Sequence, residues 1–421
     1  KLLGGSIVFY TIGEAGYITI LLACVLVNYT GTRLMYRKST DGRGIRQKRL
    51  LLLALGYDLG VLFFFKYSGL ASGLPLGISF YTFQIMAYVI DVYRGRIPAE
   101  QSLLRLGTYL TMFPQLISGP ITNYADVRVA LGRERTIKAR QLEEGMKLLI
   151  IGLAAKVVIA DRIGTLWNSI RMIGFDSIST KLAWMGAFAY SLQLYFDFAG
   201  YSMMARGIGK MLGFELPVNF RYPYISKSVT EFWRRWHITL GRWFREYVYI
   251  PLGGNRKGKA RTFFNLFVVW SLTALWHGAN YNFLIWGGIL LCCLLVEKLF
   301  LLRLLDKSRV IGHLYVLFVV PLSWVAFAVT DLSELGVYMT RLFPFAGHAA
   351  GVINHLDYLK YLNDYAPLFL LGVLFATPLP ETCYRLIERK WIGRVILLGI
   401  FGLCMYYLAV SANNPFLYFN F

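Results

Sequence analysis

Charged residues are scarce in this sequence. Only 16% of its 421 residues are Asp, Glu, Lys or Arg, and the 35 residues between Arg261 and Glu297 contain none of the four. A soluble protein of this size has no means of burying a chain that is 57% hydrophobic. The scarcity of charge therefore excludes a soluble globular protein and indicates a chain that crosses a membrane many times.

The sequence also lacks the cysteine patterns of metal sites and of disulfide frameworks. Its five cysteines form no Cys-x-x-Cys pair and no cluster with histidine; they are Cys24, Cys292, Cys293, Cys383 and Cys404. Four of them lie in apolar runs, where cysteine behaves as a small hydrophobic residue. We therefore expect no metal site, no disulfide and no tightly bound cofactor.

Apolar runs recur along the whole chain. A helical span needs about 20 apolar residues, and the runs lack the alternation of membrane strands. We expect an all-α polytopic membrane protein with about eleven transmembrane helices, in one membrane-embedded domain over residues 1–421 that lacks a preceding N-terminal segment. The runs are 16–32, 49–66, 74–91, 103–122, 145–165, 182–205, 263–280, 280–297, 311–330, 365–380 and 393–411.

The net charge of +21 comes from basic residues that gather in short loops, which are 33–49, 128–140, 221–261 and 385–394. Such loops mark the cytoplasmic side of a membrane protein and contact anionic lipids. They therefore predict topology, and nucleic-acid binding is not expected. If the loops on both sides of 103–122 are cytoplasmic, that segment crosses as a re-entrant pair of half-helices broken by Pro114 and Pro120, and it lines a tunnel.

The stretch 228–254 has the pattern of an amphipathic helix. Ser228 and Glu231 have capping-box spacing, which predicts a helix start. At 100° per residue one face is aromatic and apolar and the other is mainly arginine, so we expect an interfacial helix and a basic loop on the cytoplasmic side, over 228–262. The apolar face carries Trp233, Trp236, His237, Leu240, Trp243, Phe244, Tyr247 and Val248, and the other carries Arg234, Arg235, Arg242, Arg245 and Glu246.

Two readings of this stretch remain open. His237 is either a satisfied core histidine or a functional one. The arginine face is either a solvated surface or a site for an anionic cofactor that carries phosphates.

His277 lies near the middle of the uncharged stretch 262–296. An ionisable group at membrane depth is costly and indicates function, and a neutral imidazole there typically serves as a proton relay or a general base. Gly278 predicts a break between two helices, so 263–297 is expected to form a hydrophobic hairpin with His277 near the tunnel wall. Asn280 and Asn282 can orient polar groups beside it.

Asp197 is the only charged residue between Lys181 and Arg206. It either orients a histidine or stabilises its charged form, or it caps a helix break beside Gly200. The sequence does not decide between these roles.

Three stretches together resemble the membrane-bound O-acyltransferase family, and within it the branch of the alginate O-acetyltransferase membrane subunit. They are YFDFAGYS (195–202), GFELPVNFRYPYISKSVTEFWRRWHITLGRWFREYVYIPLGGNRKG (213–258) and LWHGANYNFLIWG (275–287). The resemblance implies a helical fold around a tunnel, in a bacterial plasma membrane. It also implies an enzyme that takes an acetyl group from cytoplasmic acetyl coenzyme A for O-acetylation of an extracytoplasmic polysaccharide, directly or through a partner acetyltransferase of the serine-hydrolase type.

By the same resemblance, His277 matches the catalytic histidine in the membrane and His237 matches a second functional histidine near the cytoplasmic mouth. Residues expected to bind the donor or line the tunnel are Trp233, Arg234, Arg235, Trp236, Asp197, Trp276 and Asn280. Relatives commonly carry Asp where this chain has Met203, a departure that weakens the case for an acid assisting catalysis at this position.

Three other functions remain as alternatives. D-alanyl transfer to teichoic acid uses a related protein of the same family. A proton-coupled transporter would use His277 and Asp197 as a relay without acyl chemistry, although no inverted repeat is evident. A scaffold that recruits a secreted acetyltransferase would not need His277.

Overall fold

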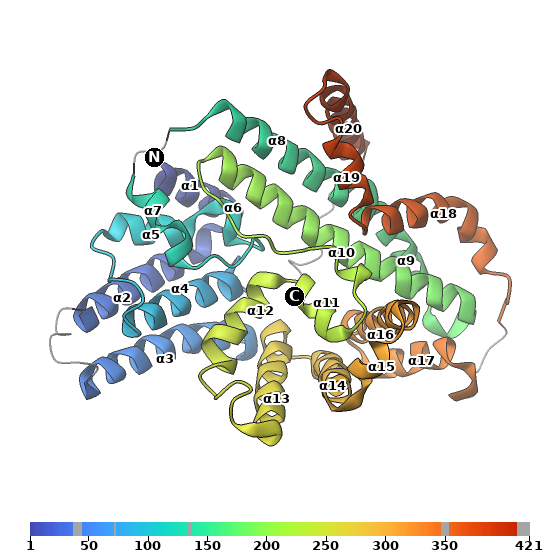
Figure 1. The fold of residues 1–421 in the computed structure, drawn as a ribbon, viewed down its shortest axis with the longest axis horizontal. Coiled ribbons are helices and arrows are strands. Elements are labelled where there is room, and N and C mark those ends of the chain that lie inside the picture. The colour runs from blue at the N-terminus through green and yellow to red at the C-terminus, as the bar shows by residue number, and fades with distance from the viewer. Residues whose placement is uncertain (37–43, 71–72, 134–135, 347–352, 411–421) are drawn as a thin grey trace. The chain divides into compact units, whose positions relative to one another are not determined.

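The computed structural model describes residues 1–36, 44–70, 73–133, 136–346 and 353–410 (Figure 1). Most of the described residues are helical, and they contain no β-strand, as an all-α membrane protein requires. Parts of the basic loops 33–49 and 128–140 lie outside the described residues. The chain divides into two compact units, with residues 1–149, 204–218 and 239–251 in unit 1 and 150–203, 219–238 and 252–421 in unit 2.

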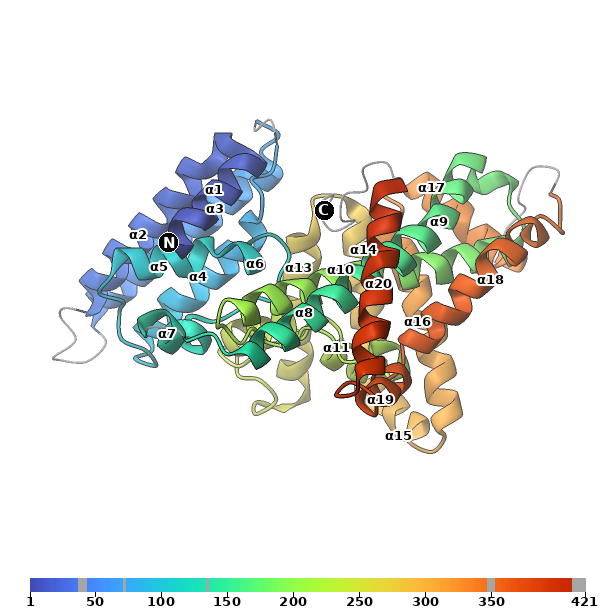
Figure 2. The same cartoon turned by 90° about the horizontal axis from the view of Figure 1, so that it is seen from above.

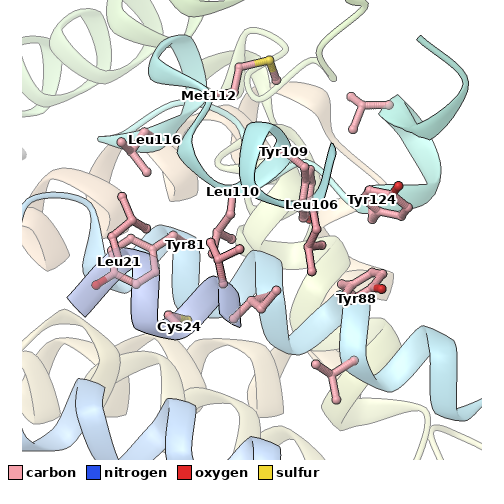
Figure 3. Close-up of a cluster of buried hydrophobic side chains, with 14 of the residues drawn as sticks. Leu21, Cys24, Tyr81, Tyr88, Leu106, Tyr109, Leu110, Met112, Leu116 and Tyr124 are labelled. Carbon is pink, nitrogen blue, oxygen red and sulfur yellow. The ribbon is translucent and has the colours of Figure 1, made fainter. Parts of the chain in front are cut away.

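Unit 1 contains the N-terminal helices. Its helices are α1 (Leu2–Glu14), α2 (Ile18–Tyr36), α3 (Ile45–Tyr67), α4 (Ile78–Tyr93), α5 (Leu103–Thr111), α6 (Phe113–Leu116), α7 (Tyr124–Gly132), most of α8 (Ala139–Ala154), the end of α10 (Thr180–Met211) and α12 (Ile238–Phe244), which a π-helical turn, Arg245–Tyr249, continues. Helices α2, α3 and α4 pack against one another (Figures 1 and 2). The buried side chains of this core include Leu21, Tyr81 and Tyr109 (Figure 3).

The segment expected to be re-entrant is broken. Helix α5 ends at Thr111, and the short helix α6 follows after Met112 with Pro114 in its first turn. Proline fits there because the first turn has no helical partner for its missing N–H. The interruption is therefore present at Met112, while re-entry into a membrane stays a prediction.

Unit 2 contains the remaining helices. Residues Ala155–Ala160 form a π-helical stretch that leads from α8 into α9 (Asp161–Ile173). The others are most of α10, α11 (Val229–Arg235), α13 (Gly258–His277), α14 (Tyr281–Val296), α15 (Leu302–Leu305), α16 (Arg309–Ala328), α17 (Leu332–Leu342), α18 (Tyr358–Phe375), α19 (Leu379–Arg385) and α20 (Trp391–Val410). Helices α13, α14 and α16 form one packed group, with α14 contacting both of the others.

Five helical segments among the described residues are long and apolar enough to cross a membrane. They are Leu2–Tyr36, Ile45–Tyr67, Tyr281–Leu305, Arg309–Ala328 and Trp391–Val410. The pair α18 and α19, bent by 69°, raises the number to six if it forms one broken span. These segments fit a multi-pass membrane protein, and the count of about eleven, the tunnel and the single domain stay predictions.

Helices α8 and α10 approach closely at glycines. In unit 1 a Cβ on Gly207 would lie 2.5 Å from the carbonyl oxygen of Gly145, and in unit 2 one on Gly200 would lie 2.6 Å from that of Gly152. Small residues of this kind let helix backbones pack tightly in membranes. Because α10 runs unbroken from Thr180 to Met211, Asp197 does not cap a helix break beside Gly200, and that alternative was wrong.

Candidate functional site

Helix α13 places His277 at its last residue. Gly278 leaves the helix with extended backbone angles, φ 174° and ψ 175°. A Cβ on Gly278 would lie 2.4 Å from the Phe283 ring, so glycine is needed for the close approach of α14. The break predicted at Gly278 is present, and it leaves His277 at a helix end with only 7% of its surface exposed.

Aromatic rings from three helices surround the His277 imidazole. Trp286 of α14 and Phe327 of α16 lie edge-to-face to it, with ring centroids at 5.0 Å and 5.1 Å. Trp276 of α13 lies at 4.7 Å and Phe283 at 6.1 Å. Asn282 Nδ2 donates to the Phe327 carbonyl at 2.8 Å, so it ties α14 to α16, the two helices that carry Trp286, Phe283 and Phe327.

The start of α11 is fixed by two side chains. The Glu231 N–H donates to Ser228 Oγ at 3.0 Å, so the predicted helix start is confirmed. The buried carboxylate of Glu297 accepts hydrogen bonds from the Val229 N–H at 2.6 Å and the Thr230 N–H at 2.9 Å. A carboxylate on the first N–H groups of a helix satisfies donors that have no helical partner, and here it anchors α11 within unit 2.

The prediction of one helix over 228–254 was wrong, because the chain breaks at His237. Helix α11 ends at Arg235, α12 begins at Ile238, and His237 between them has a left-handed φ of 43°. Asn219 stabilises this turn twice: its side-chain oxygen lies 3.1 Å from His237 Nδ1, and its carbonyl accepts the Ile238 N–H at 2.9 Å. Helical periodicity carries no signal for a break held by a distant segment.

His237 is a buried, neutral histidine. It is 2% exposed, and its ring lies edge-to-face to Phe198 with centroids at 4.8 Å. Burial lowers the pKa of His237 to about 3. Because Asn219 offers an amide oxygen, the neutral ring donates from Nδ1 and carries its lone pair on Nε2.

Trp276 joins the two histidines. Its ring centroid lies 6.2 Å from that of His237 and 4.7 Å from that of His277. The structure therefore brings His237, Trp276 and His277 together within unit 2.

A cluster of tryptophans adjoins His277 on the side of Trp286. Trp233 and Trp270 have ring centroids 5.8 Å and 5.9 Å from that of Trp286, and Trp236 packs on Trp324, which stacks on Trp286. The indole nitrogens of Trp233 and Trp286 are buried and have no hydrogen-bond partner among the described residues. Buried N–H groups without a partner are rare and costly in proteins, so these two donors are candidates for contact with a ligand.

Asp197 lies in an ion-paired group that the sequence analysis missed. Its carboxylate is 2.8 Å from Lys156 Nζ, and Lys156 also pairs with Asp161. Lys156 and Asp197 are 5% and 1% exposed. Asp197 is therefore paired with a lysine, whereas the next residue, Phe198, contacts His237. A lysine inside the apolar run 145–165 was the feature of the sequence that could have predicted this pair.

The remaining residues that were predicted to bind the acyl donor are either held in local contacts or exposed. The Arg235 guanidinium pairs with Glu231 at 2.8 Å and donates to the Arg221 carbonyl at 3.2 Å, so it holds local structure. Arg234 and Asn280 are exposed. In the basic loop, Arg256, Lys257 and Lys259 are also exposed.

Residues 96–311 match the sequence model of the membrane-bound O-acyltransferase family. The chain belongs to this family. It is 34% identical to the probable alginate O-acetylase of Pseudomonas putida, over 100% of this chain and 94% of that protein. It is 29% identical to a peptidoglycan O-acetyltransferase of Helicobacter pylori, over 99% of this chain and 90% of that protein.

A relative from the D-alanyl branch matches a smaller part of the chain. The teichoic acid D-alanyltransferase of Bacillus subtilis is 32% identical over 52% of this chain and 58% of that protein. As a member of the family, the protein is an O-acyltransferase with membrane-spanning helices. The resemblance to the alginate O-acetylase branch is thus confirmed by relatives that match almost the entire chain.

Proposed function

We propose that this O-acyltransferase takes the acetyl group of acetyl coenzyme A at the cytoplasmic face of a bacterial plasma membrane and delivers it for O-acetylation of an extracytoplasmic polysaccharide. The observation that carries the proposal is the His277 imidazole, buried at a helix end inside a shell of aromatic rings. The O-acetylases that match nearly the whole chain support the acetyl group and the polysaccharide. The acceptor receives the group directly or through a serine-hydrolase-type acetyltransferase partner.

In the proposed reaction His277 is the general base. The imidazole takes the proton of an acceptor hydroxyl as its oxygen attacks the thioester carbonyl. The tetrahedral intermediate then expels the thiolate of coenzyme A, which receives the proton back from the imidazolium. Such proton transfer typically contributes about 10² to 10⁴-fold to the rate.

The indole N–H groups of Trp286 and Trp233 are assigned to the oxyanion of that intermediate. Both N–H groups are buried and have no partner among the described residues. The Trp286 ring lies against His277, and the Trp233 ring lies against Trp286. Preorganised donors aimed at developing negative charge stabilise a transition state in an apolar site far more than in water. The base and the oxyanion donors then come from neighbouring helices, α13, α14 and α11.

We assign His237 to positioning. Its Nδ1–H bond to Asn219 and its contact through Trp276 hold the turn between α11 and α12 beside His277. Asparagine should replace it well, because asparagine tolerates left-handed backbone and carries a donor in a similar place.

The low pKa of His237 predicts a pH dependence of stability. In the unfolded chain a histidine binds a proton near pH 6.5, whereas the folded state keeps His237 neutral down to about pH 3. The contribution of His237 to the free energy of unfolding is therefore fully present above about pH 6.5 and decreases as the pH falls toward 3. We expect the thermal midpoint to fall between pH 7 and pH 5 by less in His237→Asn than in the wild type; equal falls would contradict the burial of a neutral ring.

Donor binding is assigned to the exposed basic groups, Arg234 with Arg256, Lys257 and Lys259. Coenzyme A carries several phosphate charges, with which guanidinium and ammonium groups pair. Arg234→Gln is expected to raise the KM for acetyl coenzyme A about tenfold with little change in kcat, since one charge-assisted hydrogen bond is lost. Arg389→Gln, in another exposed basic segment, is the control; an equal rise in both variants would refute a specific phosphate contact.

The proposed donor is tested by the release of free coenzyme A from acetyl coenzyme A by the full chain in nanodiscs. Alginate, peptidoglycan fragments and a serine-hydrolase-type acetyltransferase are supplied as acceptors in separate reactions. Release that depends on an acceptor supports the proposal and names the acceptor class. Cleavage of a D-alanyl thioester alone would assign D-alanyl transfer, and no thioester cleavage with any donor would favour transport.

A further inference from the structure

A buried acid lies in unit 1, apart from the residues assigned to acyl transfer. Asp58 is near the middle of α3, one of the membrane-spanning helices, and is 2% exposed. It shares the buried face of α3 with Ala54 and Leu62, four residues before and after it. That face packs on α2 and α4. An ionisable side chain at such a depth is costly and indicates a function.

Both direct partners of the Asp58 carboxyl come from α2. Asn28 Nδ2 donates to Asp58 Oδ1 at 2.7 Å, and the Cys24 thiol lies 3.5 Å from the same oxygen. The other N–H of the Asn28 amide is used by the Cys24 carbonyl, at 3.0 Å. Within the described part of the chain, Asp58 forms no ion pair with lysine, arginine or histidine.

Two oxygens of this group have no hydrogen-bond partner in the part of the chain that the structure describes. Asp58 Oδ2 and Asn28 Oδ1 are both buried, and no donor among the described residues reaches either. If Asp58 is ionised, both atoms are acceptors and neither satisfies the other. A single proton on Oδ2 makes that atom a donor, and a carboxylic acid and an amide can then form two parallel hydrogen bonds. One of the two, from Asn28 Nδ2 to Asp58 Oδ1, is already present.

We propose that unit 1 contains a proton-binding site in which the Asp58 carboxyl holds one proton and donates it to the amide oxygen of Asn28. The proton removes a charge from the apolar interior and gives both orphaned oxygens a partner. The site contains none of the residues assigned to acyl transfer, so a test of the proton site does not depend on the proposed function.

The other titratable groups near Asp58 are a thiol and phenols. Cys24 faces it from α2 and Tyr81 from α4, while Tyr57 is its neighbour on α3. Tyr10 of α1 interacts with Tyr81 in turn. Tyr81 and Cys24 belong to the same buried cluster (Figure 3), and the hydroxyls of Tyr81 and Tyr10 have no partner among the described residues. None of these thiol and phenol groups can supply a positive charge that would stabilise an ionised Asp58.

Infrared spectroscopy of the full chain in nanodiscs tests the site directly. The wild-type spectrum at neutral pH, minus that of Asp58→Asn, should contain the carbonyl band of a protonated carboxyl group, shifted in heavy water. Asp126→Asn is the control, because the Asp126 carboxylate is paired with Arg242 at 2.8 Å in the same unit. That variant should lose carboxylate bands only. Loss of carboxylate bands alone in Asp58→Asn would overturn the proposal.

Thermal unfolding provides a second readout. Asp58→Asn should unfold near the wild-type temperature, because two amides can form the same pair of hydrogen bonds. Asp58→Val should unfold at a lower temperature, since it leaves the Asn28 amide without a partner. Equal loss in both variants would show that the negative charge itself is required and would overturn the proposal.

A monovalent cation could also bridge two unpartnered oxygens, so the infrared experiment is repeated with sodium replaced by choline. A carbonyl band of equal size in both salts supports a proton. A band that appears only in the absence of sodium would assign the two oxygens to a cation and would overturn the proton site.

Discussion

Replacing His277 with alanine is expected to reduce coenzyme A release by about 10² to 10⁴-fold, the usual contribution of a general base. The expectation follows from the position of the ring. Gly278 ends α13 directly after it, and Trp286 and Phe327 enclose it with centroids 5.0 Å and 5.1 Å away. The ring is enclosed by aromatic side chains, which do not accept protons. Water should therefore replace the missing base only inefficiently. The measurement is the initial rate with saturating acetyl coenzyme A and an acceptor.

His313→Ala is the matched control for this variant. His313 belongs to α16 of the same unit, is partly buried and has Nδ1 3.2 Å from the Ser226 carbonyl. Its replacement should change the rate by less than tenfold. Full activity of His277→Ala would refute the catalytic assignment and favour a scaffold that recruits a secreted enzyme. An acetylated protein trapped with donor alone, absent in His277→Ala, would show an acetyl-histidine intermediate in place of a general base.

Replacing Trp286 with phenylalanine is expected to lower kcat by about 10² to 10³-fold and to leave KM nearly unchanged, as loss of an oxyanion donor does elsewhere. Phenylalanine keeps an aromatic ring against His277 and removes the indole N–H. The side chain is fully buried, and its N–H has no partner among the described residues. A thioester oxygen becomes a stronger acceptor as the tetrahedral intermediate forms, so the lost interaction belongs to the transition state.

Trp270→Phe tests whether packing alone explains such a loss. The Trp270 ring packs on that of Trp286 with centroids 5.9 Å apart, and both side chains are buried. A large drop in kcat for Trp286→Phe and a small one for Trp270→Phe would support the oxyanion assignment. Equal drops, or a change confined to KM, would assign Trp286 to the shape of the site.

Local signals predicted part of the site correctly. A histidine inside a long uncharged run followed by glycine gave both the buried position of His277 and the helix break behind it. The Ser228 and Glu231 spacing gave the start of α11. These features depend on residues only a few positions apart, which is the range over which a sequence pattern carries structural information.

Contacts between distant segments account for what the sequence did not predict. The break at His237 depends on Asn219, 18 residues earlier, and the pairing of Asp197 depends on Lys156 in another helix. Asp58 was overlooked because one acid in the run 49–66 hardly lowers its average hydropathy, although a lone acid in such a run is itself a signal. The tryptophan cluster joins α11, α13, α14 and α16, and no periodicity within one helix reveals it.

The glycine contacts between α8 and α10 bear on mutational tolerance. Gly145 faces Gly207, and Gly152 faces Gly200, so the contacts recur seven residues apart on each helix in opposite chain directions. A Cβ on Gly145, Gly200 or Gly207 would meet backbone atoms of the other helix, which cannot rotate away as a side chain can. In a randomised library selected for folded protein, the codons of Gly145, Gly200 and Gly207 should therefore stay nearly invariant, while lipid-facing codons beside them vary.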